Sequence, residues 1–158
     1  MKQIESWLAP YPPDAELDSI VESLGQNDWM TFTAPWHRSS HVLIARDDDH
    51  AITGYLRFVV QQIGEEDEHL PVVWANVPLL EAKVLAFGVI EAQRRLGIGQ
   101  ALQLFMLNEA RTLGCYQVRS HSSGDNIANH ALKIAMGFAV QPIIRGNDRG
   151  GVYFVKAL

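Results

Sequence analysis

The chain has 158 residues, a formal net charge of -5 from 13 basic and 18 acidic side chains, and a hydrophobic content of 47%. This length predicts one domain over residues 1–158 with a full core, and the hydrophobic content excludes a disordered chain. The acidic balance argues against nucleic acid as a partner and favours a cationic small molecule.

The first half of the chain predicts one helix followed by strands. After an N-terminal lead-in that ends in a proline cluster at 10–13, helical spacing of apolar residues predicts a short amphipathic helix over 14–24. β-branched and aromatic residues predict strands at 41–46 and 51–63, joined by an acidic turn. A second exposed turn at 65–68 precedes an extended segment, 72–80, that Pro78 interrupts.

The second half alternates strands and helices. The apolar run Val84–Ile90 predicts a central strand that is buried on both faces. Similar patterns predict helices over 98–113 and 126–136, a strand over 116–121, and a terminal hairpin of 138–144 with 151–155. The second helix carries four apolar residues on one face, namely Ile127, Ala131, Ile134 and Ala135. This order indicates a mixed α/β sheet with helices on its faces.

A glycine-rich segment, 93–100, lies between the predicted central strand and the long helix. Gly97 and Gly99 would let first-turn N–H groups of the helix approach a phosphate, and Arg94 and Arg95 add positive charge. The segment lacks the GxxxxGK[ST] string of a mononucleotide loop and the third glycine of a dinucleotide fingerprint. From these residues alone, a phosphate site and a plain structural turn are equal alternatives.

Two motifs resemble the GNAT superfamily of acyl-CoA-dependent N-acyltransferases. The family's Q/R-x-x-G-x-G/A loop is matched by Arg94-Arg95-Leu96-Gly97-Ile98-Gly99. Its Asn that opens the next helix, and the Gly-Phe pair that closes it, are matched by Asn126 and Gly137-Phe138. The resemblance covers 82–140, with a looser match over 41–63. It implies a central, mostly antiparallel sheet with helices on both faces, and acetyl-CoA as the co-substrate.

The resemblance also implies which residues hold the acyl-CoA. The backbone of Phe87, Gly88 and Val89 would pair with the pantetheine arm like an added strand, and an amide at Val89 or a neighbour would serve the oxyanion. The pyrophosphate would be held beside Arg94 by the amides of Arg95, Leu96, Gly97, Ile98, Gly99 and Gln100. Asn126 would contact the pantetheine from the opposite wall, although it could equally be a helix N-cap.

Three side chains are candidates for proton transfer. The family's usual acid, a Tyr seven residues after the Asn, is replaced by Lys133, which could be an acid, a phosphate partner or a solvated helix residue. Glu81 shares odd parity with Phe87 and Val89, hence one strand face, and could be the general base. His121, with a reference pKa of about 6.5, is the other candidate base. The plain alternatives are a solvated carboxylate for Glu81 and a hydrogen-bonded loop residue for His121.

The implied activity is transfer of an acetyl group from acetyl-CoA to a primary amine of a small molecule or peptide by direct attack. A non-catalytic acyl-CoA-binding or regulatory module is the alternative, and a nucleotide-binding protein is a remoter one. We expect no metal, because Cys115 is the only cysteine and His37 and His41 lie in a strand-like segment. We also expect a cytoplasmic protein without a membrane span or secretory signal, and a homodimer is plausible through the terminal hairpin.

Overall fold

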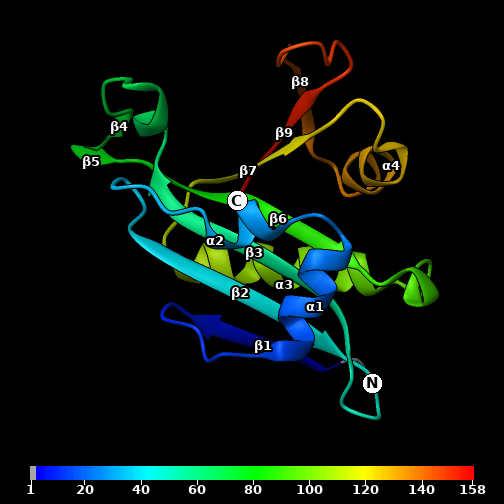
Figure 1. The fold of residues 1–158 in the computed structure, drawn as a ribbon. Coiled ribbons are helices and arrows are strands. Elements are labelled where there is room, and N and C mark those ends of the chain that lie inside the picture. Colours follow the sequence, from blue (N-terminus) through cyan, green and yellow to red (C-terminus); the bar gives the residue numbers. More distant parts are fainter. Residues whose placement is uncertain (1–2) are drawn as a thin grey trace.

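The computed structural model describes residues 3–158 and contains a seven-stranded sheet with the order β1-β2-β3-β6-β7-β9-β8 (Figure 1). Its strands are β1 (Gln3–Leu8), β2 (Ser39–Arg46), β3 (Ile52–Gln62), β6 (Leu80–Val89), β7 (Gln117–Ser122), β8 (Ala139–Pro142) and β9 (Val152–Ala157). Neighbouring strands are antiparallel except β6 and β7, which are parallel. The first two residues of the predicted lead-in lie outside the described residues.

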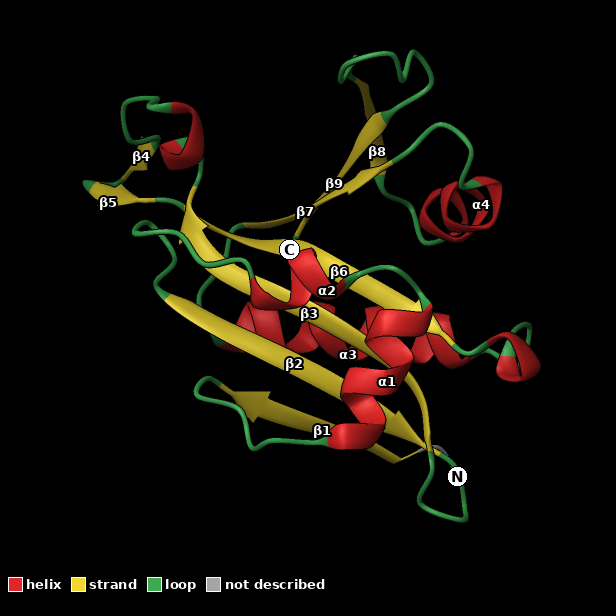
Figure 2. Cartoon of the chain, in the orientation of Figure 1, coloured by secondary structure: helices red, strands yellow, loops and turns green. Residues whose placement is uncertain are grey.

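Helices cover both faces of the sheet, as predicted (Figure 2). On one face lie α1 (Ala15–Ser23), whose Leu17 and Val21 are buried against β2 and β3, and the short α2 (Asn27–Thr31). The Asp14 side chain caps α1 by accepting the Leu17 N–H at 2.9 Å. The other face is covered by α3 (Ile98–Thr112), which buries apolar residues at helical spacing. Among the described residues, no helix is long and apolar enough to cross a membrane.

The N-terminal half contains elements that the sequence did not predict. The expected lead-in is wrong at 3–8, because these residues form the edge strand β1, in register with β2 from Gln3↔Arg46 to Leu8↔His41. The helix α2 is also additional. The extended segment 72–80 folds into a small hairpin, β4 (Val73–Trp74) with β5 (Val77–Pro78), before β6 begins. Two short 3-10 helices lie in the connections: η1 (Glu65–Asp67) between β3 and β4, and η2 (Glu91–Gln93) between β6 and α3.

The helix α4 (Ile127–Ala135) is oriented opposite to what its apolar pattern suggests. The four predicted apolar residues do share a face, but that face is exposed, with Ile127 at 70% and Ile134 at 60%. The buried residue of the helix is instead Lys133, at 0% exposure. Periodicity identifies which residues share a face, and here the packing of α4 beside α3 decides which face points inward.

Candidate active site

The strands β6 and β7 separate halfway along β6. Their pairing ends at Val84↔Ser120, although β6 continues to Val89. A β-bulge lies at the same place, since Arg57 of β3 pairs with Ala86 and Phe58 with Val84, which leaves Leu85 without a partner. The prediction that β6 is buried on both faces is therefore wrong beyond Val84, and Leu85 and Phe87–Val89 are half-buried.

The bulge also changes which face each side chain takes. Before it, Ala82 and Val84 point into the core beneath α3, and after it Phe87 and Val89 do so. Because one extra residue shifts the alternation of a strand, Glu81 lies on the opposite face from Phe87 and Val89. The parity argument that placed them on one face is wrong for this reason.

Beyond the bulge, backbone groups of β6 that point away from β3 are bonded by side chains. The Phe87 N–H donates to Gln26 Oε1 at 3.1 Å, and the Val89 carbonyl accepts from Arg94 Nε at 3.2 Å. Gln26 Oε1 also accepts from the Tyr55 hydroxyl at 2.8 Å. These are the strand-edge positions that a ligand added like a further strand would use.

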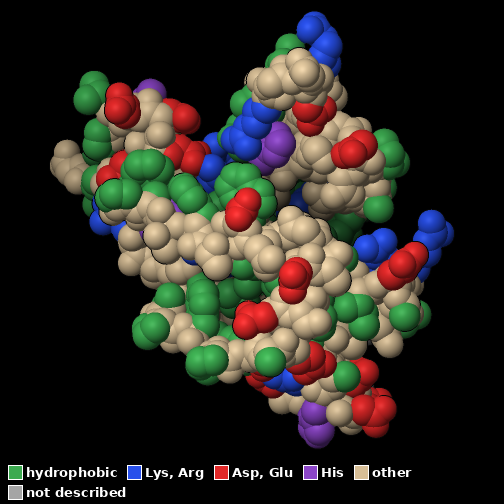
Figure 3. Space-filling view, viewed as in Figure 1, with side chains coloured by type: hydrophobic (Ala, Val, Ile, Leu, Met, Phe, Trp, Pro, Cys, Tyr) green, Lys and Arg blue, Asp and Glu red, His purple; other side chains and the backbone are tan. Residues whose placement is uncertain are grey.

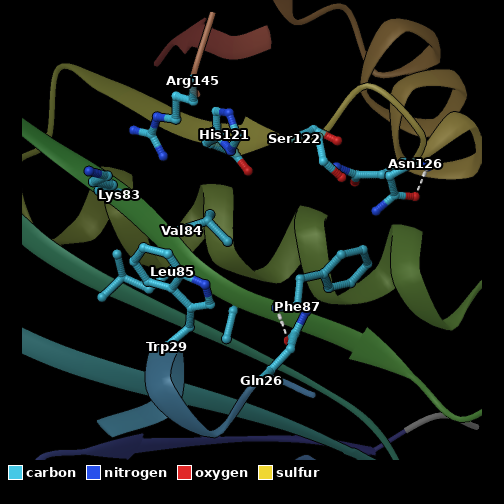
Figure 4. Close-up of a pocket in the computed structure, with 14 residues that line it drawn as sticks. Gln26, Trp29, Lys83, Val84, Leu85, Phe87, His121, Ser122, Asn126 and Arg145 are labelled. Atoms are coloured by element: carbon cyan, nitrogen blue, oxygen red, sulfur yellow. Dashed lines mark hydrogen bonds between the residues drawn. The ribbon is translucent and has the colours of Figure 1, made fainter. Parts of the chain in front are cut away.

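A cavity of about 390 Å³ opens where the two strands separate (Figure 4). Three residues singled out from the sequence for roles at the site line it, namely Phe87, His121 and Asn126. Three of the polar atoms in its wall are buried without a hydrogen-bond partner, namely Ser122 Oγ, Asn129 Oδ1 and His121 Nε2. Since buried polar groups normally find partners, the wall suits a ligand rich in amide donors and acceptors, as pantetheine is.

Several lining residues escaped the sequence argument. Gln26 is the residue before α2, Asn129 lies in α4 and Arg145 lies in the β8–β9 hairpin. The sequence signal for Asn129 was its position one turn after Asn126. For Gln26 and Arg145 there was no local signal, because only the tertiary fold brings these segments to β6.

The glycine-rich loop follows β6 and η2 and enters α3. Gly97 is the N-cap of α3, with φ of 77°, and its helix start has no side-chain cap. Arg95 is also left-handed, with φ of 63°. A Cβ on Gly99 would lie 3.0 Å from Phe87 Cζ, so the glycine lets α3 pack closely against β6. Uncapped first-turn N–H groups and a left-handed residue beside them form an anion-binding arrangement.

Asn126 has the capping role that the sequence allowed. It is the N-cap of α4, and its Oδ1 accepts the Asn129 N–H at 3.2 Å. Asn126 also lines the cavity, on the wall opposite Phe87 (Figure 4). Capping and ligand contact are therefore compatible at this residue.

His121 is the candidate base that lies at the cavity. Its ring meets Tyr153 edge-on with centroids 5.5 Å apart. Burial lowers the pKa of His121, the cations Arg145 and Lys83 lower it further, and Asp148 opposes them. The imidazole is thus neutral near pH 7 and can accept a proton.

Glu81 is not a solvated carboxylate, because its side chain is fully buried. Its oxygens accept hydrogen bonds from Gln61 at 3.1 Å, Gln117 at 2.9 Å and Arg119 at 2.8 Å. Burial raises the pKa of Glu81, while the hydrogen bonds from Gln117 and Gln61 act in the opposite direction. Glu81 does not line the cavity, so the structure gives it a place in a buried polar network.

Lys133 is likewise buried, which excludes the solvated alternative. Its Nζ donates to Gln103 Oε1 at 2.7 Å and lies 4.4 Å from the centre of the Phe138 ring. Burial lowers the pKa of Lys133 to about 7. It lies between α3 and α4 and is absent from the residues that line the cavity.

Residues 3–158 contain no group of three His, Cys, Asp or Glu side chains that could hold a metal ion. Cys115 is buried, and burial raises the pKa of its thiol to about 11, so it remains protonated at neutral pH.

Comparison with known proteins adds to this geometry. A family model described as the acetyltransferase (GNAT) family matches residues 1–138. A Klebsiella pneumoniae protein provisionally described as an acyl-CoA N-acyltransferase is similar in structure, with 18% identity, a TM-score of 0.72, and coverage of 100% of this chain and 98% of that one.

Two similar structures contain the coenzyme. Arabidopsis thaliana NAA60 in complex with acetyl-CoA has 17% identity, a TM-score of 0.62 and 99% coverage of both chains. A Bacillus subtilis acetyltransferase in complex with CoA has 15% identity, a TM-score of 0.66 and 99% coverage of both. At these identities the likeness shows the fold. The search among curated protein sequences finds no significant match.

Proposed function

Because the chain belongs to the acetyltransferase (GNAT) family, we propose that it transfers an acetyl group from acetyl-CoA to the primary amine of a small molecule. The observation that carries this proposal is the separation of β6 from β7 after Val84. This separation exposes the edge of β6 and opens a cavity whose wall contains buried polar atoms without partners. The uncapped start of α3 follows β6 along the chain.

The donor would bind along that edge. The strand edge at Phe87–Val89 becomes available to the donor once Gln26 and Arg94 release it: the Phe87 N–H faces the thioester carbonyl, and the Val89 carbonyl pairs with the pantetheine arm. Asn126 and its neighbours in α4 hold the opposite side of the arm. The amides from Arg95 to Gln100 hold the pyrophosphate at the start of α3, with Arg94 adding charge. Structures of this fold with acetyl-CoA and CoA support this choice of co-substrate.

The thioester of the donor supplies an electrophilic carbonyl carbon. The Phe87 N–H, two residues before the expected Val89, is the donor best placed for the developing oxyanion, because it faces the cavity side and already binds an amide oxygen. His121 accepts the proton of the amine as the nitrogen–carbon bond forms. The carbon–sulfur bond then breaks and its electron pair leaves on sulfur. A thiol pKa of about 8.5 lets the thiolate depart without a dedicated acid, so Lys133 is not required.

Two glycines at opposite ends of α3 provide a sharp test. Gly97 and Gly114 both have left-handed backbones, with φ of 77° and 80°. Gly97→Ala and Gly114→Ala therefore carry similar backbone strain, but only the first lies at the proposed pyrophosphate site. By calorimetric titration we expect Gly97→Ala to weaken acetyl-CoA and CoA binding at least tenfold and Gly114→Ala to leave it unchanged. Binding of ATP or NAD in preference to CoA would contradict the proposal.

Turnover distinguishes an enzyme from a non-catalytic acyl-CoA-binding module. An enzyme releases free thiol from acetyl-CoA at a rate that rises with amine concentration. A module binds acetyl-CoA with the same sensitivity to Gly97→Ala but releases no thiol when amines are added.

A further inference from the structure

The charge of the cavity is opposite in sign to that of the whole protein. The chain has a net charge of -5, yet none of the 14 described residues that line the cavity is acidic. Lys83 and Arg145 are cationic, and His121 is titratable. Figure 3 shows basic and histidine side chains together in the hollow between the arm that carries β4 and β5 and the β8–β9 hairpin.

These three residues lie at the end of the cavity that faces away from the glycine-rich loop. In Figure 4, Lys83, His121 and Arg145 cluster at one end and Asn126 lies at the other. Lys83 is six residues before Val89 on β6, a separation of about 20 Å in an extended strand. The loop after Val89 has its own cations, and this basic cluster is too distant from it to serve the pyrophosphate. With the pyrophosphate at the loop, as proposed above, this end of the cavity is left for the acceptor.

Two of the nearby cations are already neutralised. Lys83 pairs with Glu66, and Arg119 bridges Glu66 and Glu81. Neither carboxylate belongs to the lining of the cavity. The two carboxylates therefore neutralise Lys83 and Arg119 without lining the cavity themselves.

Arg145 differs, because it makes no ion pair with a carboxylate among residues 3–158. Its guanidinium lies over the Tyr153 ring, 5.1 Å from the centre, and donates to the Tyr153 hydroxyl. Burial is the main cause that lowers the pKa values of Lys83 and His121, and the positive charge of Arg145 acts in the same direction on both. A guanidinium has five N–H donors in a planar fork, so donors remain for a second oxygen-bearing group.

We propose that the acceptor carries an anionic group beside its amine and that Arg145 binds this group at the cavity mouth. The inference rests on the proposed acetyl transfer. A carboxylate fits the planar fork of Arg145 in bidentate geometry, and a phosphate shares the same chemistry. Lys83 lines the β6 side, but its charge is already paired with Glu66, so the attraction for the anionic group comes from Arg145. The amine of such a molecule then lies toward His121 and the thioester, and a purely cationic acceptor such as a polyamine is disfavoured by repulsion from Arg145.

The test uses matched pairs of acceptors in the acetyl-CoA thiol-release assay. L-amino acids are compared with their amides, and O-phosphoethanolamine with ethanolamine. We expect the anionic member of at least one pair to have the higher kcat/KM, and the pair that shows it identifies carboxylate or phosphate. Arg145→Gln should raise KM for that acceptor by about 10- to 100-fold and remove its advantage over the neutral partner. Arg145→Lys, which keeps the positive charge, should retain part of the advantage of the anionic acceptor.

Arg149→Gln is the matched control, since Arg149 is an exposed arginine of the same hairpin outside the cavity lining. It should change neither KM. Equal or better use of neutral amines or polyamines overturns the inference, as does an Arg145→Gln effect that is equal for both members of a pair. Turnover of neither series by protein that binds acetyl-CoA overturns it as well. Failure to bind acetyl-CoA would instead remove the proposed function and the inference together.

Discussion

Gln26 Oε1 accepts the backbone N–H of Phe87 at 3.1 Å, at the point where β6 has lost its neighbour. The same oxygen accepts the hydroxyl of Tyr55, whose side chain is fully buried. Gln26 thus satisfies two polar groups of the sheet. In the proposed binding mode a ligand carbonyl or oxyanion takes the same position, so we expect acetyl-CoA to displace this side chain.

Gln26→Ala should therefore separate stability from ligand response. We expect the free energy of unfolding without ligand to fall by about 1–3 kcal/mol, because the Tyr55 hydroxyl and the Phe87 N–H lose their acceptor. Acetyl-CoA should stabilise this variant more than the parent, since it no longer displaces Gln26. Urea unfolding with and without acetyl-CoA measures both quantities. The control is Tyr55→Phe, which removes only the hydroxyl and should be stabilised by acetyl-CoA as much as the parent is. If acetyl-CoA stabilised Gln26→Ala no more than the parent, displacement of Gln26 by the ligand would be contradicted.

Local sequence signals singled out three of the residues that line the cavity, namely Phe87, His121 and Asn126. The left-handed backbone at Gly97 and the capping by Asn126 each depend on a few neighbouring residues, so two short motifs were enough to single out both positions. The mixed sheet and its two helical faces followed from the order and period of the elements. Long helices such as α3 were predicted within a residue or two because their apolar spacing is regular.

What the sequence could not predict depends on contacts between distant segments. The bulge at Leu85 arises from the register with β3, and it inverts the face of Glu81 relative to Phe87. The exposed apolar stripe of α4 and its buried Lys133 depend on how the helix packs beside α3. Arg145 reaches the cavity only because the β8–β9 hairpin folds over the end of β7. Periodicity within one element contains none of this information.

Lys133 should make stability depend on pH. Its pKa is lowered from 10.5 to about 7 by burial, so between these values the unfolded chain holds a proton that the folded protein lacks. Stability then rises with pH in this window, by about 1.4 kcal/mol per unit for this one group. Lys133→Met, which keeps an unbranched side chain, should abolish this contribution. The parent must deprotonate or bury a charged Lys133 on folding, and the variant does not, so we expect Lys133→Met to be the more stable protein at neutral pH. Urea unfolding should show that this difference is greatest near pH 7 and shrinks toward pH 10.

An advantage of Lys133→Met that is constant across this range would show that Lys133 keeps an ordinary pKa. The same variant should retain amine-dependent thiol release, because Lys133 does not line the cavity. A large loss of kcat in folded Lys133→Met would assign Lys133 to the chemistry after all.

The buried pair of Glu81 and Arg119 should be structural. Glu81→Ala leaves Arg119, Gln61 and Gln117 without the oxygens that they now bind, and we expect a loss of about 3–5 kcal/mol in the free energy of unfolding. Glu22→Ala, at an exposed position of α1, should change stability little. If activity per folded molecule also fell by orders of magnitude at saturating substrates, Glu81 would be the general base in place of His121.

His121 and Arg145 should be coupled through charge. Removing the cation in Arg145→Gln should raise the pKa of His121, while burial and Lys83 still hold it down and Asp148 still raises it. Titration of the His121 ring protons by NMR, assigned by their absence in His121→Asn, measures the shift directly. Arg149→Gln should leave the titration unmoved. His121→Asn should lower kcat by about 10²- to 10⁴-fold, the usual contribution of a general base. An unshifted titration in Arg145→Gln would mean that Arg145 does not act on the cavity, whereas an unchanged kcat in His121→Asn would remove His121 from proton transfer.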